Sequence, residues 1–123
     1  MTTTTTATDA EMRQRTLDAI HEFIAEANTN LLPGEAARRG YQNDHYLEVD
    51  TGRKYIRIAI WLGGCQRSVH CFVGCAPGIW GDVYKAAGWK APMLNGARYN
   101  LLDADSRAEM YRRFDFAGGY LYK

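Results

Sequence analysis

The chain has almost no net charge and no long apolar run, and these absences exclude several classes of protein. Its 15 Lys and Arg residues are balanced by 14 Asp and Glu, which leaves a formal net charge of +1. Bulk electrostatic binding of nucleic acid needs a larger positive excess, although a local basic patch stays open. No apolar run approaches the roughly 20 residues that span a bilayer. The N-terminus lacks the basic and apolar regions of a secretory signal. We therefore expect an intracellular protein without membrane contact.

Cysteine pairs and cofactor motifs are also missing. Cys65, Cys71 and Cys75 are an odd number without CxxC spacing, which fits a reducing compartment better than a disulfide framework. We expect Cys65 and Cys75 at opposite ends of one strand, about 30 Å apart, too far for a bridge. His70 and Cys71 are adjacent on that strand and point to opposite faces, which argues against a zinc site. No GxxxxGK or GxGxxG phosphate loop occurs. We expect neither a metal nor a cofactor.

What the sequence does contain is the pattern of an antiparallel meander within residues 45–90. In its central run, Ile56, Ile58 and Ile60 alternate with Tyr55, Arg57, Ala59 and Trp61, and this period of two predicts a strand with one buried face. Similar runs lie upstream and downstream, separated by glycine-containing turns. The arrangement predicts four strands joined in sequence order.

The turns between these runs predict how the strands pair. A two-residue hairpin at Thr51-Gly52 would set Leu47 opposite Ile56, because glycine tolerates the positive φ that such turns require. A second hairpin, at the next pair of glycines, would set Ile58 opposite Val69. Both pairings place these side chains on one face of the sheet.

The predicted sheet has two unlike faces. The inner face is aliphatic and needs a helix to cover it; its members are Leu47, Val49, Ile56, Ile58, Ile60, Val69, Cys71, Val73 and Val83. The outer face carries Tyr46, Tyr55, Arg57, Trp61, His70, Phe72 and Tyr84. Antiparallel sheets usually leave a polar face to water. This outer face is too aromatic for that, so we expect something to cover it or bind it.

The segment before the sheet predicts a helix. Thr8 and Glu11 have the spacing of a capping box, in which each side chain satisfies a backbone N–H of the first turn. We expect this helix to end at Pro33-Gly34. The chain would then continue as a polar connection over residues 35–43. Its apolar residues recur at 3.6-residue spacing and would cover the inner face; they are Met12, Leu17, Ile20, Phe23, Ile24, Ala27 and Leu31.

The segment after the sheet predicts a short strand, a second helix and an aromatic tail. Residues 98–101 favour the strand, and Asp103 or Asp105 can cap a helix that runs to about Phe114. The tail at residues 120–122 alternates Tyr, Leu and Tyr, so we expect it to dock on the fold.

These patterns together predict one α+β domain. It consists of an N-terminal helix packed on a four-stranded antiparallel meander, followed by the short C-terminal helix and the aromatic tail. We assign residues 8–123 to this domain and residues 1–7, a threonine run, to a disordered lead.

An enzyme site would have to start from Ser68, His70 and Asp82, which could share the outer face. Ser68 and His70 are two residues apart on one strand, a separation of about 7 Å that is too long for contact between nucleophile and base. The sequence also lacks a nucleophile elbow. We therefore predict that the protein is not an enzyme.

A basic and aromatic set is the stronger candidate site. Aromatic faces stack nucleobases and cations pair with phosphates, while Trp, Tyr and Arg also anchor protein interfaces. The competing interpretation is that the C-terminal helix and the tail cover this face and form a second small core. The predicted ligand or partner contacts are Arg57, Trp61, Arg67, His70, Tyr84, Lys85, Trp89, Lys90 and Arg98, with Tyr99 next to them.

Three stretches resemble a known group of proteins: GDVYKAAGWKAP at residues 81–92, RYNLLD at 98–103 and AGGYLY at 117–122. They are similar to small, largely uncharacterised proteins of tailed bacteriophages, particularly those of actinobacteria. Residues 75–80 form a longer turn than that group tends to have. The resemblance implies a phage or prophage origin, synthesis in the bacterial cytoplasm and an accessory role, and it carries no activity.

The predicted function is therefore that of a small phage-encoded accessory binding protein. It would act in the bacterial host, on a host or defence component, and bind a protein or a nucleotide-like ligand through the basic-aromatic face. Two alternatives stay open: a virion or assembly component that works by protein contacts only, and a single-stranded nucleic-acid binder. The chain could also form a homo-oligomer.

Overall fold

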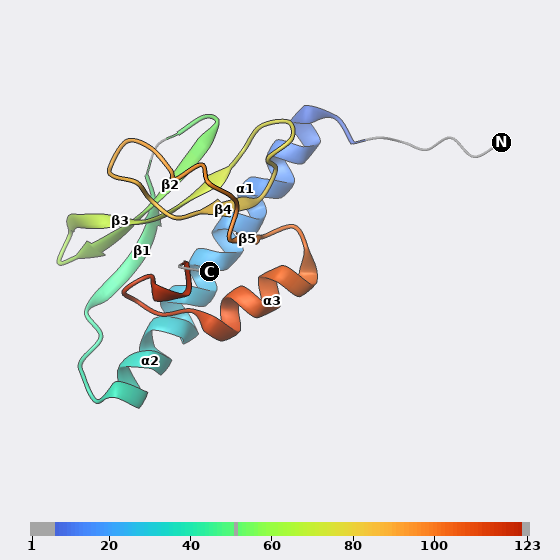
Figure 1. Ribbon diagram of the computed structural model, residues 1–123. Helices are drawn as coiled ribbons and strands as arrows, with labels where there is room; N and C mark the ends of the chain where they lie inside the picture. Colours follow the sequence, from blue (N-terminus) through green and yellow to red (C-terminus); the bar gives the residue numbers. More distant parts are fainter. Residues whose placement is uncertain (1–6, 51, 122–123) are drawn as a thin grey trace.

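The computed structural model describes residues 7–50 and 52–121, which form a curled antiparallel sheet covered by helices (Figure 1). The predicted α+β class is confirmed. Apart from Ala7, the predicted disordered lead lies outside the described residues, and so does Tyr122 of the tail. In chain order the elements are α1 (Asp9–Glu26), the π-helical η1 (Ala27–Leu31), α2 (Leu32–Arg39), β1 (His45–Val49), β2 (Tyr55–Leu62), β3 (Cys65–Gly74), β4 (Asp82–Tyr84), β5 (Tyr99–Asn100), α3 (Ala104–Arg113) and the 3-10 turn η2 (Gly119–Leu121).

The sheet has five strands in the order β1-β2-β3-β4-β5, and each strand is antiparallel to its neighbours. The prediction of four strands was one too few. The short strand expected at residues 98–101 is β5, and it pairs with β4 so that Tyr99 lies opposite Val83. β5 therefore extends the meander by one strand.

The register between β1 and β2 differs from the prediction. Leu47 lies opposite Ile60, not Ile56. The connection is longer than a two-residue hairpin, and the backbone N–H of Asp50 still donates to the carbonyl of Arg57 at 2.8 Å. The register moves by four residues, an even number, so Leu47 stays on the inner face as predicted.

The register between β2 and β3 also differs, because the pairing is interrupted at two places in β2. Ile58 lies opposite Cys71 rather than Val69. A bulge re-aims the side chain of the extra residue, and here that residue is His70. His70 was predicted on the outer face, but it is buried and its Nε2 lies 2.6 Å from the hydroxyl of Tyr120.

One hydrophobic core lies between the inner face of the sheet and the helices. Seven of the nine predicted inner-face residues are buried, and Val49 and Val69 are half-buried. α1 and α3 meet over this core, with the ring of Phe23 at 5.9 Å from Tyr111 and 6.0 Å from Phe114. The predicted role of the N-terminal helix as a cover for this face is confirmed, and α3 shares it.

The N-terminal helix does not end at Pro33-Gly34. The predicted capping box at Thr8 and Glu11 is present, and the helical rod continues through η1 and α2 to Arg39. Proline cannot donate a backbone hydrogen bond and clashes inside an α-helix. The wider π-helical turn of η1 comes directly before it, so Pro33 falls at the start of α2, where a donor is not needed. Residues 35–39, predicted as a polar connection, are therefore helical.

The π-helical turn also connects the helix to the sheet. β1 is an edge strand, so the backbone of Leu47 has no strand partner on one side. The side-chain amide of Asn28 donates to the Leu47 carbonyl at 3.0 Å and accepts the Leu47 N–H at 2.7 Å. Asn28 thus satisfies the backbone N–H and carbonyl that face away from β2, as a further strand would.

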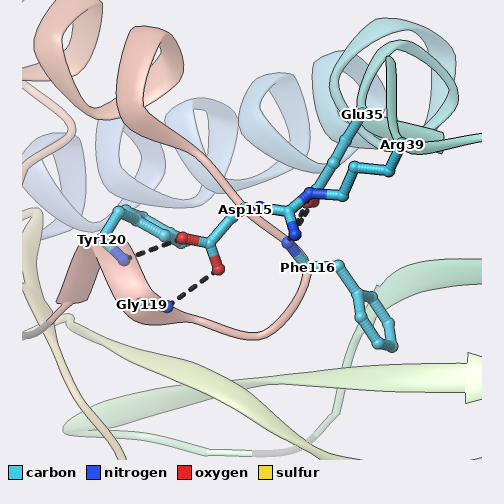
Figure 2. Close-up of polar contacts among 6 residues, drawn as sticks. All are labelled: Glu35, Arg39, Asp115, Phe116, Gly119 and Tyr120. Carbon is cyan, nitrogen blue, oxygen red and sulfur yellow. Dashed lines mark hydrogen bonds and ion pairs between the residues drawn. The ribbon is translucent and has the colours of Figure 1, made fainter. Parts of the chain in front are cut away.

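The tail docks as predicted, but as a 3-10 turn and on the inner side of the sheet. Tyr120 and Leu121 are buried and belong to the main core. The carboxylate of Asp115 accepts the backbone N–H groups of Gly119 at 2.8 Å and Tyr120 at 3.1 Å, which fixes the turn (Figure 2). The idea that α3 and the tail cover the outer face was wrong, because both pack on the inner face.

Candidate binding surface

The segment between β4 and β5, residues 85–98, carries most of the exposed large hydrophobic residues of the described chain. We refer to it as the β4–β5 loop. Four large hydrophobic residues are exposed among the described residues, and three of them lie here: Trp89 at 45%, Met93 at 36% and Leu94 at 65%. The fourth, Tyr41, follows α2. Exposed apolar residues that gather on one segment mark an interaction surface more often than scattered ones do.

Backbone contacts hold the β4–β5 loop in one shape. Ala86 and Pro92 form an isolated antiparallel bridge, and the N–H of Met93 donates to the carbonyl of Lys85 at 2.7 Å. At the end of the loop, Arg98 donates from Nε to the carbonyl of Leu121 at 2.7 Å. The same guanidinium donates to Gly96 and Asn95, at 2.7 and 3.1 Å. These contacts order the loop that carries Trp89, Met93 and Leu94.

Arg57 connects this loop to the outer face of the sheet. Its Nε donates to Asp50 Oδ2 at 2.6 Å, and its Nη2 also pairs with that carboxylate. Its Nη1 donates to the Trp89 carbonyl at 2.5 Å, and the guanidinium lies 5.5 Å from the centre of the Trp89 ring. The charge of Arg57 is therefore balanced by Asp50, and its main role in the structure is to seat Trp89.

Two predicted contacts lie away from this loop. Trp61 stacks on Tyr46 with ring centres 6.4 Å apart, across β1 and β2. Its indole nitrogen is buried, and no hydrogen-bond partner accepts from it among the described residues. Arg67 is exposed on β3, close to the turn between β2 and β3. The structure does not bring either residue together with Trp89.

His70 and Tyr84 are both buried. Desolvation lowers the pKa of His70 from 6.5 to about 4, and the carboxylate of Asp115 opposes this effect only in part. His70 also lines a cavity of about 180 Å³ together with Lys85 and Leu121. Tyr84 packs edge-on against Tyr55 at 5.7 Å, and its burial, followed by the charge of Asp82, raises its pKa. Neither aromatic ring is open to a partner in the way that Trp89 is.

The remaining predicted contacts lie in the β4–β5 loop. Lys90 is exposed next to Trp89, and the Nζ of Lys85 lies 3.9 Å from the sulfur of Met93. Arg98 is half-buried and engaged with the backbone, as described above. The loop therefore carries Lys85, Trp89 and Lys90 and uses Arg98 as a support, with the Lys85 side chain beside Met93.

Sequence reasoning missed the apolar part of this surface. Met93 and Leu94 were not among the predicted contacts, and an apolar pair directly before the turn-forming Asn95-Gly96 is the signal that could have revealed them. Asp50, the partner of Arg57, was also missed, since the pairing depends on the register of β1 and β2.

The described residues, 7–50 and 52–121, contain neither a cluster of metal ligands nor a membrane-spanning helix. In this part of the chain, no three His, Cys, Asp or Glu side chains converge as metal ligands. The three cysteines are free, with Cys65 exposed and Cys71 and Cys75 buried. None of the described helices combines the length and apolar character needed to cross a bilayer.

Comparison with known proteins identifies a family for this chain, but no relative whose role is known. No curated protein and no solved structure matches the chain. One family model matches residues 2–123, which is nearly the whole sequence. The chain therefore belongs to a family of unknown function, DUF7717.

Proposed function

We propose that this chain is a small, non-enzymatic binding protein that recognises a partner protein through the exposed apolar residues of the β4–β5 loop. The contact residues are Trp89, Lys90, Met93 and Leu94. In keeping with the phage resemblance of the sequence, we further propose that it is phage-encoded and acts on a host or defence protein inside the bacterial cell.

The observation that carries this proposal is the gathering of Trp89, Met93 and Leu94 on one ordered loop. Tryptophan is among the residues that most often dominate binding energy at interfaces. A loop that is already ordered loses less conformational entropy on binding than a flexible one. Both properties favour protein recognition.

The chemistry of the loop also indicates the kind of partner. Lys90 is exposed directly after Trp89 in the loop. We therefore expect an apolar pocket with carboxylates at its rim. A nucleic acid fits less well, because Arg57 is paired with Asp50 and one face of Trp89 is occupied by Arg57. Met93 and Leu94, which are aliphatic, cannot stack on bases.

The experiment is capture of partners from host lysate with a photo-crosslinking residue at Leu94, followed by mass spectrometry. The variants Trp89→Ala and Met93→Asp, each made in the chain that carries the crosslinker, should lose the captured protein, because each removes an exposed apolar anchor of the loop. Ala108→Asp is the matched control, since it introduces the same charge on exposed α3 and should capture as the wild type does.

Three results would contradict the proposal. Capture that is unchanged in both loop variants would remove the loop from the interface. Salt-sensitive binding of an oligothymidylate that depends on Trp89 would support the single-stranded nucleic-acid alternative. Crosslinking only to structural proteins in purified particles would support the virion alternative.

A further inference from the structure

A second cavity, of about 330 Å³, lies on a different part of the molecule from the β4–β5 loop. It forms where the end of α2, the start of β1 and the turn after α3 meet. The side chains that define its chemistry are Glu35, Arg39, Tyr41, His45, Asp115 and Phe116. Three of these carry rings and three carry charge.

Glu35 is the buried charge of this cavity. It is 3% exposed, and its carboxylate accepts the backbone N–H of Phe116, at 2.7 Å to Oε1 and 3.2 Å to Oε2. Figure 2 shows Glu35 reaching from α2 to this N–H, with Asp115 directly before it in the turn. Buried carboxylates are retained where they have partners. The N–H of Phe116 supplies a hydrogen bond but no positive charge.

Arg39 supplies the only cation among the cavity side chains named above. Its Nε lies 3.7 Å from Glu35 Oε2 and its side chain is 68% exposed, against 4% for that of Glu35. An exposed arginine at this distance contributes little to stability and can move into solvent at small cost. The guanidinium of Arg39 therefore occupies the place where a better-fitting cation would meet Glu35.

The wall around these charges is aromatic. The rings of His45 and Phe116 lie 4.5 Å apart at 51°, and Tyr41 is 42% exposed beside them. The faces of Tyr and Phe attract cations. The carboxylates of Glu35 and Asp115 outnumber the guanidinium of Arg39 by one, so the cavity also carries an excess of negative charge.

We propose that this cavity binds an organic cation with a guanidinium or ammonium head on a short apolar stem. Glu35 accepts the head, Tyr41 and Phe116 pack on the stem, and Arg39 is an internal competitor for the same carboxylate. This site is separate from the β4–β5 loop and does not depend on the function proposed for it.

The test is an NMR titration that follows the backbone amide of Phe116, which donates to Glu35 and so reports on that carboxylate directly. The probes are agmatine, a free small cation, and a capped Gly-Arg-Gly peptide, which presents the same head on a protein chain. A shift with agmatine indicates a small-molecule site, and a shift with the peptide alone indicates a site for a partner's arginine. Either response supports the cation site.

Two pairs of variants separate the site from general electrostatics. Arg39→Ala should bind the cation several-fold more tightly, whereas Arg38→Ala, the same change on the neighbouring exposed residue, should leave affinity near the wild-type value. Glu35→Gln keeps an oxygen for the Phe116 N–H but loses the charge, and should weaken binding about tenfold. Glu48→Gln, exposed on β1, is its control.

The outcomes that overturn the proposal are equally direct. If Arg39→Ala binds no better than Arg38→Ala, Arg39 is not a competitor and the assigned geometry is wrong. If inorganic phosphate shifts the Phe116 amide while both cations leave it unmoved, Arg39 is an anion site. The comparison of Arg39→Ala with Arg38→Ala tests the cation site even if Glu35→Gln fails to fold.

Discussion

The two faces of the sheet are covered in different ways. The inner face meets α1, α3 and the tail through apolar side chains, and Ile58, Leu47 and Val73 are fully buried there. The outer face carries the buried rings of Phe72 and Tyr84, and it meets the β4–β5 loop through Arg57, which joins Asp50 to Trp89. We conclude that the inner face supplies most of the stability, whereas the outer face positions a surface.

The largest effect should follow from placing a charge on the inner face. Ile58→Asp puts a carboxylate at a fully buried position with no cation beside it, and such a group destabilises a fold by several kcal/mol. We expect loss of the cooperative thermal transition in circular dichroism. Arg57→Asp, at the neighbouring position on the outer face, is the control and should still melt cooperatively. Equal unfolding of both variants would contradict the contrast between the faces.

Removal of the tail should come next. A stop after Gly119 deletes Tyr120 and Leu121, which are both buried, and takes away the hydroxyl that pairs with His70. We expect a loss of at least about 3 kcal/mol in the free energy of unfolding, because the deletion leaves a cavity in the main core. Urea denaturation measures it. A loss within 1 kcal/mol would show that the tail is not part of that core.

Acidification tests the same core without a large deletion. The pKa of His70 is about 4 in the fold against an ordinary 6.5, so between these values the unfolded chain binds the proton and the folded chain does not. Neutral His70 therefore contributes fully to the free energy of unfolding above pH 6.5. This contribution, about 3 kcal/mol, is lost as the pH falls towards 4. Urea denaturation from pH 7 to 4 should show a steeper loss for the wild type than for His70→Gln. Parallel curves would place His70 in a solvated environment.

A smaller effect is expected where the helical rod meets the edge of the sheet. Asn28→Ala leaves the N–H and carbonyl of Leu47 without partners at a buried strand edge, which costs about 1 to 3 kcal/mol. Asn30→Ala is the matched control, because Asn30 is exposed and bonds only to Glu26 within the helix. Hydrogen exchange should show faster exchange at the Leu47 amide in the first variant alone.

These features differ in how far the sequence could predict them. The period of two assigned most of the inner face correctly although both registers were wrong, because the pairing errors at Leu47 and Ile58 were even numbers of residues and left those side chains on the same face. Val69 is the exception among the predicted inner residues, since it lies opposite Ala59 beyond the bulge. His70 escaped that rule, since a bulge breaks the alternation at one residue and leaves no mark in the sequence.

Contacts between segments that are distant in sequence could not be predicted, for a different reason. Pro33 is normally a stop signal, and only the π-helical turn before it allows the helix to continue. The cavity beside α2 joins Glu35 to the backbone of Phe116, 81 residues later, and no local pattern encodes that contact. Of the predicted binding residues, Lys85, Trp89 and Lys90 share the β4–β5 loop because they are near in sequence. Arg67 and Trp61 lie elsewhere.

The smallest effect on stability should come from Arg57→Ala, and this variant separates the two faces most sharply. The Arg57–Asp50 pair is partly exposed, so its loss should change the free energy of unfolding by no more than about 1 kcal/mol. The same change removes the hydrogen bond and the cation–π contact that seat Trp89, so the loop should loosen and partner capture should fall. The measurements are thermal denaturation, the indole N–H signal of Trp89 and capture through Leu94. Arg67→Ala, an exposed arginine away from the loop, should change none of them. A large loss of stability in Arg57→Ala would instead identify the outer face as a second core.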